Sequence, residues 1–158
     1  MDRRFGSGDG WVRCALGHKH WGIYGAAGLL VRHRDLGGSE WVLLQHRAGW
    51  SHHGGTWGVP GGARNLGESA RDAALREAAE ESDLDLESLP AGSDDSYVDD
   101  HGGWTYTTVV LRAPSAPPVA VRGAESTELR WVHADRLHDL ELHPGFAGTW
   151  PRVRELGA

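Results

Sequence analysis

The sequence has a single cysteine among its 158 residues, Cys14, so it cannot form an internal disulfide framework or a cysteine-rich zinc module. It also lacks any apolar run close to the roughly 18 residues that a membrane-spanning helix needs. The first residues include two arginines but no apolar stretch behind them, which is unlike a signal peptide. We therefore expect no membrane partner and, by default, a cytoplasmic location.

Basic residues are in the minority. The formal net charge is −6, from 22 acidic and 16 basic side chains, and this excludes a protein that coats nucleic-acid polymers. The acidic residues are concentrated between positions 68 and 100, where 12 acidic residues accompany two basic ones. Such a block is typical of a solvated face, or of a site for divalent cations, because hard cations prefer carboxylate oxygens.

The length and the 39% hydrophobic content indicate one domain with its own core. We divide the chain into an N-terminal lead-in, residues 1–20, and a domain over residues 21–158. Cys14, His18 and His20 lie in the lead-in and suggest a metal site. Because the second cysteine pair of a zinc module is absent, we interpret the lead-in as an ordinary irregular segment.

Apolar patterning predicts a mixture of strands and helices. Strands are expected at 23–31, 40–45, 56–59, 105–112 and 129–132, and helices at 69–82, 134–140 and 146–156. The helix at 69–82 is the clearest, because Ala70, Ala74 and Ala78 form a row of small residues suited to close packing on a sheet. This mixture predicts an α/β or α+β sandwich.

The predicted helix at 69–82 carries three carboxylates on one face. Glu77, Glu80 and Glu81 are spaced i, i+3 and i+4, so their side chains lie together and repel one another. A bound divalent cation would turn that repulsion into coordination. We expect Arg76 to pair with a neighbouring carboxylate, such as Glu68 or Glu80. Taken alone, this string is also typical of a solvated helix face.

The residues before the helix extend the pattern into a longer motif. Five residues separate Gly62 from Glu68, seven separate Glu68 from Arg76, and two separate Glu77 from Glu80. The fixed positions are Gly62, Glu68, Arg76, Glu77, Glu80 and Glu81, with Leu84 following. This spacing resembles the Nudix box of the Nudix hydrolase superfamily, and all six fixed positions match.

The resemblance covers residues 21–140. Residues 42–47, 57–62 and 125–132 look like the strands and loops that surround the box in this family. Two positions depart from the pattern: Ala78 replaces a larger aliphatic residue, and Asp83 replaces a glycine. We expect Asp83 to adopt the left-handed conformation at the end of the helix, at modest cost.

The resemblance implies a fold, a reaction and a set of site residues. The fold is an α/β/α sandwich with a mixed central sheet, and the reaction is hydrolysis of a nucleoside diphosphate linked to another group with Mg²⁺ or Mn²⁺. The implied metal ligands are Glu77, Glu80, Glu81 and the backbone carbonyl of Gly61. Glu77 or Glu81 would be the general base. Gly62, Glu68 and Arg76 are implied to be structural.

Further candidates lie outside the box. Glu125, on the loop before Trp131, resembles a catalytic or metal-binding glutamate of some family members, although a solvated loop carboxylate has the same pattern. Arg47 could contact phosphate through its guanidinium, or be a plain surface residue. Candidates for substrate contact are His52, His53, His101, Trp50 and Trp104, each of which also fits an ordinary loop or core position.

Two other functions fit a Nudix fold. One is a sensor that binds a nucleotide without cleaving it, which the retained carboxylates argue against. The other is an isopentenyl diphosphate isomerase, whose chemistry uses a cysteine in the site, whereas Cys14 precedes the core. The expected partner is a small-molecule nucleotide. Nucleoside triphosphates and oxidised guanine nucleotides remain open as substrates, and so does a homodimer.

Overall fold

The computed structural model describes residues 6–51, 53–89 and 95–156. Its strands are β1 (Trp11–Arg13), β2 (Lys19–Trp21), β3 (Ala26–Arg34), β4 (Glu40–Arg47), β5 (Trp57–Gly58), β6 (Gly61–Ala63), β7 (Asp95–Asp100), β8 (Thr105–Arg112) and β9 (Ser126–His133). Its helices are α1 (Ala70–Glu81) and α2 (Pro144–Val153), with the 3₁₀ turns η2 (Leu86–Ser88) and η3 (Ala134–Asp139). No helix in these described ranges combines the length and apolar content that crossing a membrane requires.

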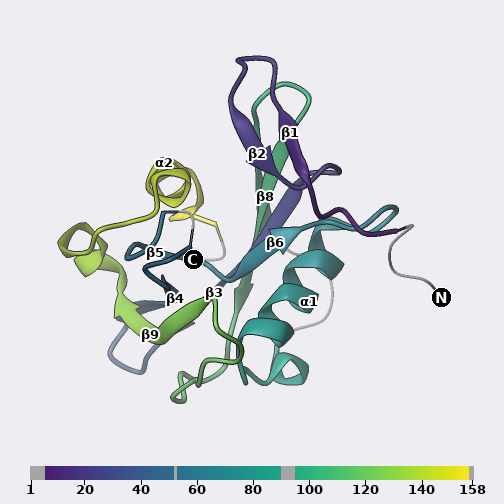
Figure 1. Cartoon of the computed structure of the whole chain (residues 1–158). Coiled ribbons are helices and arrows are strands. Elements are labelled where there is room, and N and C mark those ends of the chain that lie inside the picture. The colour runs from purple at the N-terminus through teal and green to yellow at the C-terminus, as the bar shows by residue number, and fades with distance from the viewer. Residues whose placement is uncertain (1–5, 52, 90–94, 157–158) are drawn as a thin grey trace.

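Seven strands form one mixed sheet. The order is β5-β4-β3-β8-β7, with β6 also paired to β3 and β9 also paired to β4. The pairing of β3 with β8 is parallel and runs from Ala26 opposite Tyr106 to Arg32 opposite Arg112, while the other pairs are antiparallel. A separate hairpin, β1–β2, stands beyond the sheet beside the turn that joins β7 to β8 (Figure 1).

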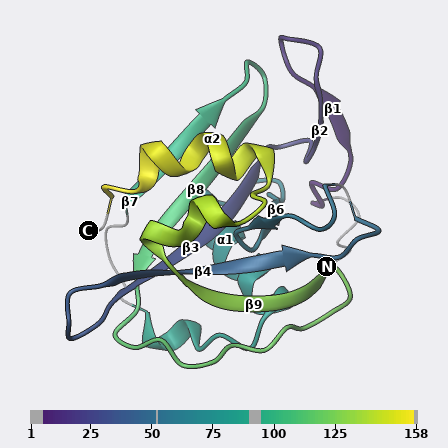
Figure 2. The same cartoon turned by 90° about the vertical axis from the view of Figure 1, so that its left-hand side faces the viewer.

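The sheet is covered on both faces, with α1 on one side and α2 with η3 on the other (Figures 1 and 2). Alternate residues of β3 enter different cores: Leu29 and Val31 pack with the alanines of α1, whereas Leu30 packs with Phe146 and Trp150 of α2. A strand buried on both faces reads as a continuous apolar run, as β3 does. The expected α/β/α sandwich with a mixed sheet is confirmed.

Helix α1 begins where the sequence predicts, but the backbone at its C-terminal end has a different conformation from the predicted one. Ser69 caps it by accepting a hydrogen bond from the Asp72 amide, and Ala74 and Ala78 are fully buried against the sheet. The expectation that Asp83 is left-handed is wrong, because His53 is the only described non-glycine residue with a positive φ. Instead Asp83 forms a pair of hydrogen bonds with the Ala120 backbone, so the chain leaves the helix extended.

Three strand regions were not predicted. The hairpin β1–β2 lies in the segment that we interpreted as irregular, β6 lies just after the strand predicted at 56–59, and β7 lies in the acidic block. β7 is at the edge of the sheet and only Tyr97 packs into the core, so it lacks the apolar alternation that marks a half-buried strand. Acidic side chains on an edge strand discourage pairing with other chains. The predicted helix at 134–140 is the 3₁₀ turn η3.

Candidate functional site

Two consecutive glycines bring the loop before α1 against the carboxylates of the helix. The Gly61 amide donates a hydrogen bond to Glu81 Oε2 at 3.1 Å. At Gly62, a Cβ atom would lie 2.6 Å from the carboxyl carbon of Glu77, which is closer than real Cβ atoms approach. A side chain at position 62 would therefore displace the Glu77 carboxylate from its place beside β6.

One guanidinium holds the carboxylates of the motif in place. Arg76 donates to both oxygens of Glu68 at 2.9 Å and to the Ala63 carbonyl at 2.9 Å. Its remaining nitrogen, Nη1, lies 3.0 Å from Glu77 Oε1 and 3.3 Å from Glu80 Oε1. These bonds lower the pKa of Glu68 and raise that of Arg76. The bidentate contact ties the loop to the helix and orients Glu77.

The carboxylates carry more negative charge than their surroundings neutralise. Glu81 is 7% exposed, and burial raises its pKa to about 8, with the charges of Glu77 and Glu125 adding to the effect. Burial also raises the pKa of Glu77, although Arg76 opposes this. Glu80 is half exposed. Ionising these carboxyl groups next to one another costs free energy. A divalent cation bound between them would offset that cost, because its positive charge favours the ionised form of each carboxylate.

Glu125 and Arg47 lie near these carboxylates. The charge of Glu125 raises the pKa of both Glu77 and Glu81, and the charge of Arg47 lowers that of Glu81. Glu125 is exposed, and its carbonyl accepts a hydrogen bond from the Ala48 amide. The pairing of β4 with β9 therefore brings the end of one strand and the start of the other to the carboxylate face of α1.

The residues predicted to contact the substrate differ in their exposure and packing. Trp50 is 71% exposed on the loop after β4, and His53 packs edge-on against His143 with ring centroids 4.8 Å apart. His52 lies outside the described residues. Trp104 is 9% exposed and donates a hydrogen bond from its indole to the Gly22 carbonyl. Because Trp104 is packed in this way, we do not retain it as a residue for base stacking.

Tyr106 is a polar residue of this region that the sequence analysis missed. Burial raises the pKa of its hydroxyl, and the negative charge of Glu81 adds to that effect. The hydroxyl lies so close to Gly28 and Gly61 that a Cβ on either glycine would clash with it. In the sequence Tyr106 is one residue of a predicted strand. Its proximity to Glu81 depends on the parallel pairing with β3, for which the sequence carries no local signal.

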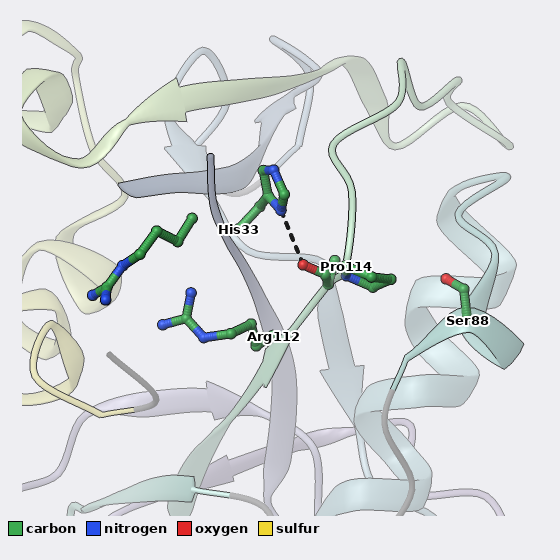
Figure 3. Close-up of a pocket in the computed structure, with 6 residues that line it drawn as sticks. His33, Ser88, Arg112 and Pro114 are labelled. Atoms are coloured by element: carbon green, nitrogen blue, oxygen red, sulfur yellow. Dashed lines mark hydrogen bonds between the residues drawn. The ribbon is translucent and has the colours of Figure 1, made fainter. Parts of the chain in front are cut away.

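Two cavities of the described surface lie away from these carboxylates. A cavity of about 470 Å³ lies near the end of β8, between His33, whose ring lies 3.0 Å from the Ala113 carbonyl, and Ser88 (Figure 3). A second one, of about 300 Å³, lies beside Tyr24 and Glu68. Neither is lined by Glu77, Glu80 or Glu81. The candidate site is marked instead by the negative charge and the burial of its carboxylates, because a site that holds a small cation does not need a large cavity.

Comparisons with known proteins agree on one family. A family model described as NUDIX domain matches residues 24–153. A Mycobacterium tuberculosis protein named "Putative 8-oxo-dGTP diphosphatase 3" is 48% identical over 159 residues, which cover 94% of this chain and 70% of that protein. A nucleoside triphosphate pyrophosphatase/Nudix hydrolase fusion protein of Bifidobacterium longum is 44% identical, over 92% of this chain and 30% of its own length.

Solved structures show the same fold. The crystal structure of a Nudix hydrolase from M. smegmatis superposes with a TM-score of 0.83 at 48% sequence identity, and the match covers 94% of each chain. An Ap4A hydrolase of C. elegans superposes with a TM-score of 0.63 at 19% identity, over 84% of this chain and 96% of its own. The second likeness shows the fold alone.

Proposed function

Because the chain belongs to the Nudix hydrolase superfamily, in which it is a pyrophosphohydrolase acting on nucleotides, we propose that it cleaves the diphosphate linkage of a nucleoside diphosphate derivative with Mg²⁺ or Mn²⁺. The observation that carries this proposal is the adjacent pair of carboxylates Glu77 and Glu81, held by Arg76 and by the Gly61 amide. Glu81 is buried and the Glu77 side chain is only 15% exposed, whereas a solvated helix face would leave both carboxylates open to water.

The residues that would hold the cation are Glu77, Glu80, Glu81 and the Gly61 carbonyl. Their donors are oxygens, which Mg²⁺ and Mn²⁺ prefer, and the raised pKa of Glu81 supports the fit because a bound cation would offset the cost of ionising that carboxyl group. When bound, the cation supplies neutralisation of the diphosphate and makes an attacking water more acidic.

The chain's own residues supply orientation and proton transfer. Glu81 or Glu77 accepts the proton of the attacking water on a carboxylate oxygen, while the Gly61 amide holds Glu81 and Arg76 holds Glu77. Arg47, whose charge acts on Glu81, would contact a phosphate oxygen of the substrate through its guanidinium. Gly62 and Glu68 act indirectly, because they fix the distance between the loop and the helix.

We further propose an oxidised guanine nucleoside triphosphate as the substrate class to test first. The support is the name of the M. tuberculosis relative, which refers to 8-oxo-dGTP and is 48% identical over nearly the whole of this chain. Trp50 and His53 are the described aromatic candidates for contact with a base. The cytoplasmic location stays a prediction, and a homodimer stays an open alternative.

We expect hydrolysis to depend strictly on a divalent cation. Mg²⁺ or Mn²⁺ should support turnover and Ca²⁺ should inhibit it, because Mg²⁺ demands a tighter octahedral geometry than Ca²⁺ provides. The measurement is release of phosphate-containing products (nucleoside monophosphate with pyrophosphate, a second nucleotide or a sugar phosphate) from a panel of nucleoside triphosphates, 8-oxo-dGTP, dinucleoside polyphosphates and nucleotide sugars. Full turnover in EDTA would refute the metal mechanism. Binding of a nucleotide without any product would support the sensor instead.

Replacing Glu125 by Gln should lower kcat on the order of 10-fold, or about 1.4 kcal/mol in the activation barrier, while the protein stays folded. The reason is that the Glu125 charge acts on both Glu77 and Glu81. Glu128→Gln is the matched control, because Glu128 lies in the same segment but pairs with Arg130. A Glu125→Gln protein with unchanged kcat on every substrate of the panel would make Glu125 a solvated loop residue.

A further inference from the structure

Three side chains that can bind a transition metal meet at the hairpin end of the molecule. Cys14 follows β1, His20 lies in β2, and His101 lies in the turn between β7 and β8. The potential ligand atoms of these three residues all lie within 4.8 Å of one another. The hairpin and the turn are joined by a hydrogen bond of 2.6 Å from the Ala15 amide to the Gly102 carbonyl, and they lie side by side in Figure 1.

Packing holds the three side chains of this cluster in place, with Cys14 buried and both histidines partly buried. Cys14 is buried and packs with Ala26 and Trp104 in a small core of its own. The ring of His20 is stacked on that of Trp104, with centroids 4.0 Å apart, and it meets the ring of His101 edge-on at 4.7 Å. Such packing holds both imidazoles in one orientation, which lowers the entropic cost of binding a ligand between them.

One nitrogen of the cluster has no protein partner. Nε2 of His20 is buried and makes no hydrogen bond to any described residue. Buried polar atoms are nearly always paired, so an exception calls for an explanation such as an ion. Burial and the neighbouring His101 lower the pKa of His20, which favours the neutral form that binds metals.

A carboxylate supports the second histidine from outside the cluster. His101 Nε2 lies 2.9 Å from Asp99 Oδ2. When a histidine donates one ring N–H to a carboxylate, the other nitrogen, here Nδ1, is left as an acceptor for a metal, and the ring is fixed in orientation. Histidines that bind zinc are almost always supported in this way.

We propose that Cys14, His20 and His101 bind a Zn²⁺ ion that joins the β1–β2 hairpin to the β7–β8 turn. Thiolate and imidazole donors suit Zn²⁺, whereas the box carboxylates suit Mg²⁺. In a tetrahedral site with bonds of about 2.0–2.3 Å, ligand atoms lie about 3.5 Å apart, so these three need to approach by only about 1 Å. The Cys14 thiol loses its proton to solvent on binding, and water occupies the fourth position.

This site is independent of the proposed hydrolysis. Its donors come from the hairpin and the β7–β8 turn, and none of them belongs to the loop–helix motif. We expect the ion to stabilise the hairpin end rather than to react with substrate, because its thiolate ligand is buried. Metal binding, and not the rate of hydrolysis, is therefore the property to measure.

The test uses Co²⁺ as a spectroscopic substitute for Zn²⁺ in the full chain. Cys14 is the only cysteine, so any thiolate-to-cobalt absorption band must come from this site. With excess Mg²⁺ present to occupy the carboxylates, we expect one equivalent of Co²⁺ to produce this band and one equivalent of Zn²⁺ to abolish it. The band should persist in Glu81→Gln, which separates this site from the box.

Three variants complete the test. Cys14→Ser should lose the band entirely, and Asp99→Asn should weaken metal affinity about 10–100-fold because it removes only the support of His101. His138→Gln, on exposed η3, is the control and should bind as the wild type does. Asp99 is partly exposed, so its variant should fold even if changes within the cluster do not. Absence of the band in the wild type, or an unchanged affinity in Asp99→Asn, would overturn the proposal.

Discussion

Glu81→Gln is expected to lower kcat by about 10²-fold or more, equivalent to roughly 2.7 kcal/mol, and Glu77→Gln should behave similarly. Each substitution nearly preserves shape but removes a negative charge that would hold the cation and accept a proton, from a buried group at Glu81 and from a largely buried one at Glu77. The measurement is steady-state kcat with saturating Mg²⁺ on the best substrate of the panel.

Without metal, the same Glu81 variant should be more stable than the wild type at high pH. Folding raises the pKa of Glu81 from 4.5 to about 8, so above pH 4.5 the folded state holds a proton that the unfolded state has lost. Wild-type stability therefore falls as the pH rises toward 8, whereas glutamine has no charge to bury. In EDTA, we expect a Tm gain of several degrees at pH 8 and almost none at pH 5, since ~1 kcal/mol corresponds to roughly 2–4 °C at this size.

Glu87→Gln is the internal control for both measurements. Glu87 is exposed in η2, beyond the box, and should change neither kcat nor Tm measurably. Excess Mg²⁺ should stabilise the wild type more than either box variant, because a ligand stabilises the state that binds it. Full activity in both Glu77→Gln and Glu81→Gln would reduce the motif to a charged helix face and refute the proposed mechanism.

Arg76→Ala is expected to destabilise the protein by about 2–3 kcal/mol, or roughly 5–10 °C in Tm. The substitution removes a bidentate contact to Glu68 and leaves Glu68 and Glu77, which are largely buried, with less compensating charge. Thermal unfolding in EDTA measures this effect without a contribution from bound metal. A second change, Glu68→Gln, should restore part of the loss, because it removes the carboxylate that the first change left unpaired.

Arg136→Ala provides the comparison for an exposed ion pair. Arg136 and Asp139 are 3.4 Å apart, but both side chains are more than half exposed, so the change should cost no more than about 0.5 kcal/mol. If Arg76→Ala and Arg136→Ala had the same small effect, the contact between Arg76 and Glu68 would be an ordinary surface pair and would not position the loop before α1.

Sequence alone is informative wherever the signal is local. The strand at 105–112 is observed with the predicted bounds, and the helix predicted at 69–82 runs from Ala70 to Glu81. The strand follows from its β-branched and aromatic residues, and the helix from its periodicity and a capping serine. The carboxylates at i, i+3 and i+4 share a face because of helix geometry alone, so their proximity needed no knowledge of the tertiary structure.

Strands without a recognisable local sequence pattern form because they pair with neighbouring strands in the folded protein. The strands of the β1–β2 hairpin have three residues each, and β7 is an acidic edge strand, so neither shows the alternation that identifies strands in a sequence. Backbone pairing and packing against their neighbours stabilise them. The helix C-terminus was likewise decided by its neighbour, because Asp83 pairs with Ala120 instead of turning left-handed.

What the sequence by itself determined is therefore the loop–helix motif, its carboxylate face and the class of sandwich that carries it. Only the tertiary structure decided which distant residues join that face. Glu125 and Arg47 reach it through the β4–β9 register, and Tyr106 reaches it through the parallel pairing of β3 with β8. His101 reaches Cys14 and His20 in the same way, from a turn more than 80 residues away along the chain. Sheet register depends on the whole core, so no local pattern of residues encodes these contacts.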